Sequence, residues 1–160
     1  MIQALRNTDE RVKNEQSITP GFLMAALLWP TLLGKCSKNG EINIRKFFRS
    51  MDGVLREQQK LTAVPRKFSS YIKDIWVLQL KLHSRIGSQP YKTLRHPRFR
   101  AAYDFLLVRE MAAGDKNGLG KWWTDFQKND DSLRGTIIAK MNEKTDEESS
   151  KIFGFSNELR

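Results

Sequence analysis

Basic side chains are the most concentrated chemical feature of this 160-residue sequence. Between residues 56 and 100 there are eleven lysines and arginines but only two acidic residues, Glu57 and Asp74, which gives a local net charge of +9. The basic residues are Arg56, Lys60, Arg66, Lys67, Lys73, Lys81, Arg85, Lys92, Arg95, Arg98 and Arg100. Phosphate is the expected partner of such an excess, because each phosphate that a cation neutralises releases condensed counterions. The competing interpretation is charge that only keeps the protein soluble, and net charge alone does not separate the two.

The positive charge is unevenly divided along the chain. Residues 1–127 hold 22 basic and 11 acidic residues, a net charge of +11, whereas residues 128–160 hold 6 and 7, a net charge of −1. We therefore expect a helical body over residues 1–127 and a polar, acidic tail over residues 128–160. The few apolar residues of this tail suffice at most for one small docked helix, and we expect the tail to be partly mobile.

Two amphipathic helices carry most of the basic residues. Apolar residues at steps of three and four over residues 68–86 predict a helix of about five turns, with polar Gln79 inside the apolar stripe. Gly87 is expected to end this helix by adopting a left-handed conformation. A second helix is expected to begin at Pro97, and residues 88–95 leave room only for a turn or one helical loop.

An apolar run over residues 22–33 predicts an earlier, buried helix. Thr19 suits its N-cap and Pro20 its first position, where a missing N–H has no consequence. Pro30 is expected to end or kink this helix, and residues 34–40 to form a loop. The run is too short to cross a bilayer, which needs ~20 apolar residues.

Residues 42–61 and 119–126 show the helical period again, and Gly53 inside the first of these stretches suggests a close approach between helices. No window alternates long enough for a strand; residues 136–138 are too short. The sequence therefore predicts an all-α protein, an irregular helical bundle of about five to seven helices with a partly mobile C-terminal tail.

Residues suited to metal or nucleophilic chemistry are few and scattered. The only soft ligands are Cys36, His83 and His96, and no phosphate-cradling GxxxxGK[ST] or GxGxxG loop occurs. His96 directly precedes Pro97, so helix entry is its expected role, and His83 is expected on a helix face. A single cysteine excludes an intramolecular disulfide and fits a reducing compartment, so we expect a cytoplasmic protein without a membrane partner.

Five stretches between residues 7 and 127 are long and rich in distinctive residues. They are NTDERV (7–12), TPGFLMAALLW (19–29), KDIWVLQLKL (73–82), HPRFRAAYDFLLVRE (96–110) and KWWTDFQ (121–127). In this order they resemble the C-terminal part of bacterial poly(A) polymerase, a polynucleotide adenylyltransferase of the tRNA nucleotidyltransferase–poly(A) polymerase family. The resemblance implies the all-helical, RNA-binding body of such an enzyme and not its catalytic head. The basic tail common in that family is replaced here by an acidic one.

The chemistry of the resembled enzymes needs groups that this chain does not present together. They hold the triphosphate with a Gly-Ser turn and two Mg²⁺ ions with an Asp-x-Asp pair on a strand. Gly87-Ser88 occurs here without such a pair after it. The carboxylates considered and rejected are Asp104, Glu110, Asp146 and Glu148. We therefore expect no catalytic residues, metal ligands or cofactor in this chain, with ATP and Mg²⁺ bound by a head outside it, and whether the chain belongs to a working enzyme stays open.

The candidate RNA-binding residues surround the central helix pair. They are Arg66, Lys67, Lys73, Lys81, Arg85, Lys92, Arg95, Arg98, Arg100 and Tyr91. If the two helices pack antiparallel, the basic clusters lie at opposite ends of the pair, with Lys81 between them. Tyr91 and one of Trp122 and Trp123 are candidates for stacking a base, although packing in the core is the favoured alternative. Adjacent tryptophans point about 100° apart on a helix, so at most one should be fully buried.

The function expected from these residues is RNA binding by the C-terminal portion of a poly(A) polymerase, which holds the RNA 3′ end for template-independent AMP addition. The alternatives are a helical interaction module that docks on a separately encoded catalytic half, or a non-functional remnant. In the resembled enzymes Met1 would lie in mid-chain, so we expect a truncated or split protein. Residues that cover the first helix would then be missing, which predicts an exposed apolar patch near the N-terminus.

Overall fold

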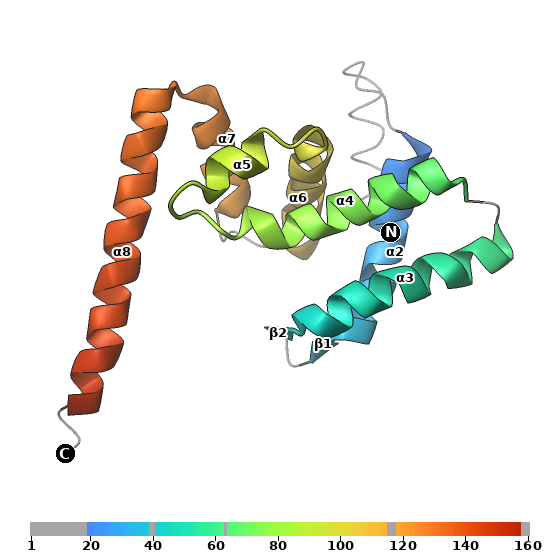
Figure 1. The fold of residues 1–160 in the computed structure, drawn as a ribbon, viewed down its shortest axis with the longest axis horizontal. Coiled ribbons are helices and arrows are strands. Elements are labelled where there is room, and N and C mark those ends of the chain that lie inside the picture. The colour runs from blue at the N-terminus through green and yellow to red at the C-terminus, as the bar shows by residue number, and fades with distance from the viewer. Residues whose placement is uncertain (1–18, 39–40, 63, 115–117, 158–160) are drawn as a thin grey trace.

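The structure is a computed structural model, and it describes residues 19–38, 41–62, 64–114 and 118–157. Within this part of the chain it is all-α, which confirms the predicted fold class (Figure 1). The seven helices and two short strands are α2 (Pro20–Cys36), β1 (Ser37–Lys38), β2 (Glu41–Ile42), α3 (Ile44–Leu61), α4 (Arg66–Leu82), α5 (Gln89–Leu94), α6 (Phe99–Ala113), α7 (Leu119–Lys128) and α8 (Asp131–Asn157). None of the helices described is both long and apolar enough to span a membrane.

Helix α2 begins as predicted and ends later than predicted. The Thr19 hydroxyl accepts a hydrogen bond from the Phe22 N–H at 3.2 Å, and proline occupies the start of the helix. Pro30 does not end the helix, which runs on to Cys36. Burial of Trp29 and Leu32 on either side of the proline explains this, because tertiary packing stabilises the helix where one backbone hydrogen bond is missing.

A two-stranded antiparallel hairpin forms where a loop and no strand were expected. Ser37 pairs with Ile42 and Lys38 pairs with Glu41. Strands of two residues are too short to show an alternating pattern, so the sequence could not reveal them. Asn43 then caps α3, its side-chain oxygen accepting a hydrogen bond from the Lys46 N–H at 3.0 Å.

Helix α4 is shorter than its apolar stripe. It ends at Leu82, and Gly87, expected as its C-cap, lies in the irregular segment before α5 with φ 57°. Ile86, the last residue of the predicted stripe, is 47% exposed. The sequence therefore placed the end of this helix about one turn too late, because Ile86 continues the helical spacing but does not enter the core.

Two hydrophobic clusters share α4 and α6. The first joins α2 and α3 to one side of these helices around Trp29, Phe47, Trp76 and Phe105. The second joins them to α7 around Leu82, Phe99, Tyr103, Trp123 and Phe126. Two buried indoles tie the elements by donating to backbone carbonyls: Trp76 Nε1 to Ala25 at 3.0 Å and Trp123 Nε1 to Leu82 at 2.9 Å. The helix pair that carries the basic residues is therefore held on both sides.

Gln79 explains the polar position in the α4 stripe. It is 2% exposed, and its amide nitrogen donates to the Ala102 carbonyl of α6 at 3.0 Å and to the Ile75 carbonyl at 3.2 Å. Its amide oxygen accepts a hydrogen bond from Arg109 Nη1 at 2.9 Å. A buried amide with both ends satisfied stabilises one relative placement of two helices, so Gln79 fixes α6 against α4.

Helix α8 is the largest departure from the sequence analysis. At most a small helix was expected after Lys128, and residues 136–138 were the only strand candidate, yet α8 runs continuously over 27 residues. Ile138 is buried against the second cluster, and Figure 1 shows the helix extending away from the other elements. The start of α8 is held to α7 by hydrogen bonds that are described below. Mobility of the tail stays a prediction.

Candidate nucleic-acid interface

Three candidate cations lie on the first two turns of α4. Arg66 and Lys67 are exposed in the first turn, with the Lys67 ammonium 5.2 Å from the centre of the Phe68 ring. Lys73 is half-buried and forms an ion pair with Asp52 of α3, Nζ to Oδ1 2.5 Å. Arg66 and Lys67 are therefore available to a ligand, whereas part of the charge of Lys73 is already matched within the fold.

Arg98 joins this group from the other central helix. Its guanidinium carbon lies 5.0 Å from the centre of the Tyr71 ring on α4. In Figure 1 α6 crosses α4 and does not run alongside it. The condition for two clusters at opposite ends of an antiparallel pair is therefore not met, and the Arg98 guanidinium lies beside Tyr71 in the first half of α4.

The helix starts in this region add to the positive potential. Neither α4 nor α6 has a side-chain cap or an acidic residue in its first turn. Most helices place acidic or capping groups there, because the N-terminal end of a helix carries partial positive charge. Here Arg66, Lys67 and Arg98 occupy those positions. The His96 Nδ1 atom accepts a hydrogen bond from the Arg98 N–H at 3.1 Å, in keeping with a helix-entry role.

The remaining cations of the central helices are more dispersed. Arg100 pairs with Asp104 one turn along α6, at 3.3 Å. Lys81, Lys92 and Arg95 are exposed, and no ion pair involves them within the described part of the chain. They lie on α4, on α5 and at the C-cap of α5, so their charge faces solvent between the two helices.

Arg85 and Tyr91 lie close to the aromatic residues of α7. The Arg85 guanidinium carbon is 5.9 Å from the centre of the Trp122 ring. The half-buried Tyr91 ring packs edge-on against Phe126, with ring centres 5.5 Å apart. Trp123 is fully buried and Trp122 is half-buried, as the predicted 100° separation requires. The ring of Tyr91 is thus engaged within the fold, and base stacking on it stays a prediction.

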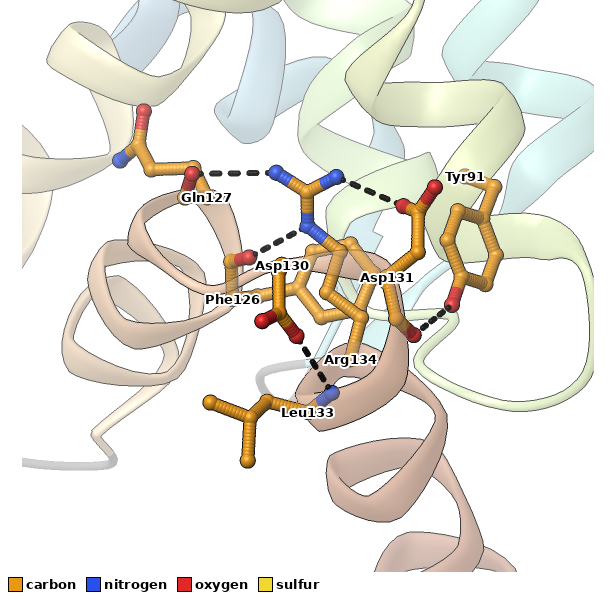
Figure 2. Close-up of polar contacts among 7 residues, drawn as sticks. All are labelled: Tyr91, Phe126, Gln127, Asp130, Asp131, Leu133 and Arg134. Atoms are coloured by element: carbon orange, nitrogen blue, oxygen red, sulfur yellow. Dashed lines mark hydrogen bonds and ion pairs between the residues drawn. The ribbon is translucent and has the colours of Figure 1, made fainter.

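The start of α8 is anchored to α7 beside Tyr91 (Figure 2). Arg134 of α8 donates from Nε to the Phe126 carbonyl at 2.9 Å and from Nη2 to the Gln127 carbonyl at 3.1 Å. These carbonyls belong to the last turn of α7, which lacks helical partners for them. The Tyr91 hydroxyl donates to the Asp131 carbonyl at 3.4 Å, which links α5 to the same corner. Sequence reasoning missed Arg134, because an arginine in a polar segment carries no local sign of a distant carbonyl partner.

A cavity of about 370 Å³ lies between α2 and α6. Its lining includes Trp29, His83, Arg109 and Glu110. The charged groups are engaged inside the fold: Arg109 stacks on Trp29 and donates to Gln79, and Glu110 Oε1 accepts a hydrogen bond from the Gly120 N–H at 2.9 Å. No group of three His, Cys, Asp or Glu residues that could hold a metal ion occurs in the described ranges.

Known proteins with similar sequences identify the family of this chain. The model of the family described as "Polymerase A arginine-rich C-terminus" matches residues 39–152. The chain belongs to this family. It is 37% identical to poly(A) polymerase I of Salmonella typhi over 133 residues, which cover 79% of this chain and 29% of that protein. It is 39% identical to poly(A) polymerase I of Escherichia coli O157:H7 over 133 residues, 78% of this chain and 28% of that protein. The corresponding protein of Haemophilus influenzae is 37% identical over 143 residues, 86% of this chain and 32% of that protein.

The family match covers the candidate nucleic-acid interface. All ten candidate residues fall within the matched range, and so does most of α8. The chain itself spans about three-tenths of the length of the curated relatives it matches. The resemblance drawn from the five sequence stretches is therefore confirmed.

Proposed function

We propose that this chain is the RNA-binding C-terminal portion of a poly(A) polymerase and holds the RNA 3′ end for template-independent AMP addition. The catalytic head, with ATP and Mg²⁺, lies outside the 160 residues. The observation that carries the proposal is that Arg66, Lys67 and Arg98 lie at two helix starts that have neither acidic residues nor side-chain caps, with Arg98 reaching across to Tyr71 of α4. Such a surface attracts polyanions.

The kind of recognition follows from the residue types. Exposed cations such as Lys81, Lys92 and Arg95 contact phosphate oxygens, which are the same in every sequence. Affinity without sequence readout suits an enzyme that must accept many different 3′ ends. In this proposal, the two hydrophobic clusters and Gln79 have the structural role of keeping the cations at fixed spacing.

A second candidate function is docking on a separate catalytic half. It is favoured by exposed apolar side chains on α2 and α3: Leu27 is 52% exposed, Ile44 60% and Phe48 46%. Exposed large apolar residues that cluster mark interaction surfaces in soluble proteins. The exposed apolar patch expected near the first helix stays a prediction, because residues 1–18 lie outside the described residues.

Salt-dependent binding to a single-stranded oligo(A) separates the two functions. Lys81, Lys92 and Arg95 are each changed to Glu in one triple variant. These side chains are exposed and form no ion pair with the other described residues, so the fold should survive, as far-UV circular dichroism will check. Binding of RNA should be lost at physiological salt. For the wild type, log K should fall linearly with log salt, and each lost phosphate contact lowers the slope by about 0.7 for a single strand.

The matched control changes Arg45, Lys46 and Arg49 of α3 to Glu, which alters the net charge by the same amount. These residues are exposed and outside the ten candidates. Equal loss of affinity in both triple variants would show that only net charge matters and would refute a defined interface. Salt-insensitive binding to a protein partner, with no affinity for RNA, would favour the docking function.

A further inference from the structure

Two buried nitrogen atoms in the described residues have no hydrogen-bond partner, and they belong to neighbouring side chains. They are Arg85 Nε and Trp122 Nε1. The guanidinium carbon of Arg85 lies 5.9 Å from the centre of the Trp122 ring, so the two side chains adjoin where the α4–α5 segment meets α7. Buried donors without an acceptor lower stability, so a pair of them in one place needs an explanation.

Packing and not hydrogen bonding fixes the Trp122 ring. It stacks on Phe126 with ring centres 4.8 Å apart and planes 11° apart, and it meets Trp123 edge-on at 4.9 Å. The buried indoles of Trp76 and Trp123 each donate to a backbone carbonyl. Trp122 therefore differs from these two tryptophans in holding a positioned ring whose N–H is unused.

A ligand that suits these two atoms must be a hydrogen-bond acceptor, and one that favours a nearby positive charge. Both orphan atoms are donors, and one belongs to a guanidinium, whose remaining nitrogens extend the donor set. A tetrahedral oxyanion such as phosphate has several acceptor oxygens close together, so it can accept hydrogen bonds from Arg85 Nε and Trp122 Nε1 at once. Exposed, unpaired Lys81 and Lys92 flank the segment that holds Arg85, so the local potential attracts an anion.

We propose that Arg85 and Trp122 form a built phosphate-binding site that holds one backbone phosphate of the bound RNA. Arg85 Nε and Trp122 Nε1 both donate to its oxygens. This assignment rests on the proposed RNA-binding function and adds to it a fixed point that sets the position of the strand on the protein. Access requires a shift of the Arg85 side chain, which lies in the non-helical segment between α4 and α5.

The test observes the indole N–H groups directly. The ¹⁵N-labelled protein has four indole resonances, from Trp29, Trp76, Trp122 and Trp123, which Trp→Phe variants assign one at a time. On titration with unlabelled oligo(A), the Trp122 resonance should move by more than the others. The resonances of Trp76 and Trp123 serve as internal controls, because their N–H groups already donate to carbonyls.

Two substitutions then measure the contribution of each donor to affinity. Trp122→Phe retains an aromatic ring on Phe126 but removes the N–H, and we expect RNA affinity to fall about three- to tenfold at an unchanged salt slope. Arg85→Lys retains the charge but removes Nε, and a similar loss is expected. Because both donors serve one phosphate, the double variant should lose less than the product of the single losses. Arg49→Lys on α3 is the matched control and should bind like the wild type.

The outcomes separate this site from the function on which it rests. If wild-type protein binds oligo(A) but the Trp122 resonance does not move and Trp122→Phe binds normally, the site is refuted while the proposed function stands; a water molecule then serves the two donors. If wild-type protein does not bind RNA, both fail together. Inorganic phosphate is titrated in parallel, and a Trp122 shift at lower phosphate than RNA concentration would overturn the assignment to an RNA backbone.

Discussion

Replacing Arg134 by Ala tests how α8 is held to the rest of the protein. The side chain is only 20% exposed and makes two hydrogen bonds to the carbonyls that end α7, with a third contact to Asp131 at 3.1 Å (Figure 2). Its guanidinium carbon also lies 5.6 Å from the centre of the Phe126 ring. A single substitution therefore removes the C-terminal cap of one helix and the anchor of the next.

The expected loss can be worked out from these contacts. A hydrogen bond from a charged donor contributes about 1.5–3 kcal/mol, but water reaches the freed carbonyls of a helix end and recovers part of it. The contact to Asp131 adds little, because that carboxylate is 86% exposed and solvent screens the pair. We therefore expect Arg134→Ala to lower the free energy of unfolding by about 2 kcal/mol.

Urea unfolding followed by circular dichroism at 222 nm measures this loss, with Arg49→Ala as the control. Arg49 is an exposed helical arginine of α3, so its replacement removes the same charge without these contacts. Limited proteolysis should also cut α8 of Arg134→Ala faster, at Lys140 and Lys144. A stability difference below about 0.5 kcal/mol between the two variants, within the range of ordinary surface substitutions, would refute the anchor.

Three further predictions concern two helical glycines, Gln79 and Cys36. Gly120→Ala should destabilise by about 1 kcal/mol, since the new methyl group would clash with Glu110 and Leu107. Gly53→Ala should stabilise by about 0.5–1 kcal/mol, because alanine favours a helix more than glycine does and, apart from the helix's own backbone, no heavy atom lies within 4 Å of the new methyl group; thermal unfolding will show the opposite signs. Gln79→Leu should cost about 2–3 kcal/mol in urea unfolding, because it removes the hydrogen bonds to half-buried Arg109 and to the Ala102 carbonyl, and a loss below 1 kcal/mol would contradict the bridging role. Burial raises the pKa of the Cys36 thiol above its ordinary value of 9.0, so the fold favours the neutral thiol and stability should fall as pH rises past 9; thiol labelling should be slow in native protein and fast in urea.

Helices were predictable from this sequence wherever apolar period and capping residues agreed. Thr19 and Pro20 located the start of α2, and the stripe over residues 68–86 located α4. Helix ends were less predictable, because they depend on partners elsewhere in the chain. Helix α2 continues past Pro30 because neighbouring residues are buried. Gly53, which was interpreted as a sign of close packing, faces open space.

The candidate interface was predictable in its residue types but not in its pairing. Charge counting selected Arg98 and Arg85, yet it could not place Arg98 over Tyr71 or Arg85 beside Trp122, since each pair joins different elements. Nor could it separate cations already matched by carboxylates, such as Lys73, from exposed ones. Such distinctions come only from the way α6 crosses α4, which a one-dimensional pattern does not contain.

The same helix pair explains both the stability of the fold and the proposed use of its surface. α4 and α6 bury one side in each hydrophobic cluster, and Gln79 fixes their crossing. Charged side chains then lie at the helix starts and in the segment between the helices, where Arg66, Arg85 and Arg98 are found. Cations fixed in this way need little ordering when a polyanion binds, so less conformational entropy opposes binding. A loss of crossing geometry in Gln79→Leu should therefore weaken RNA binding although no cation is changed.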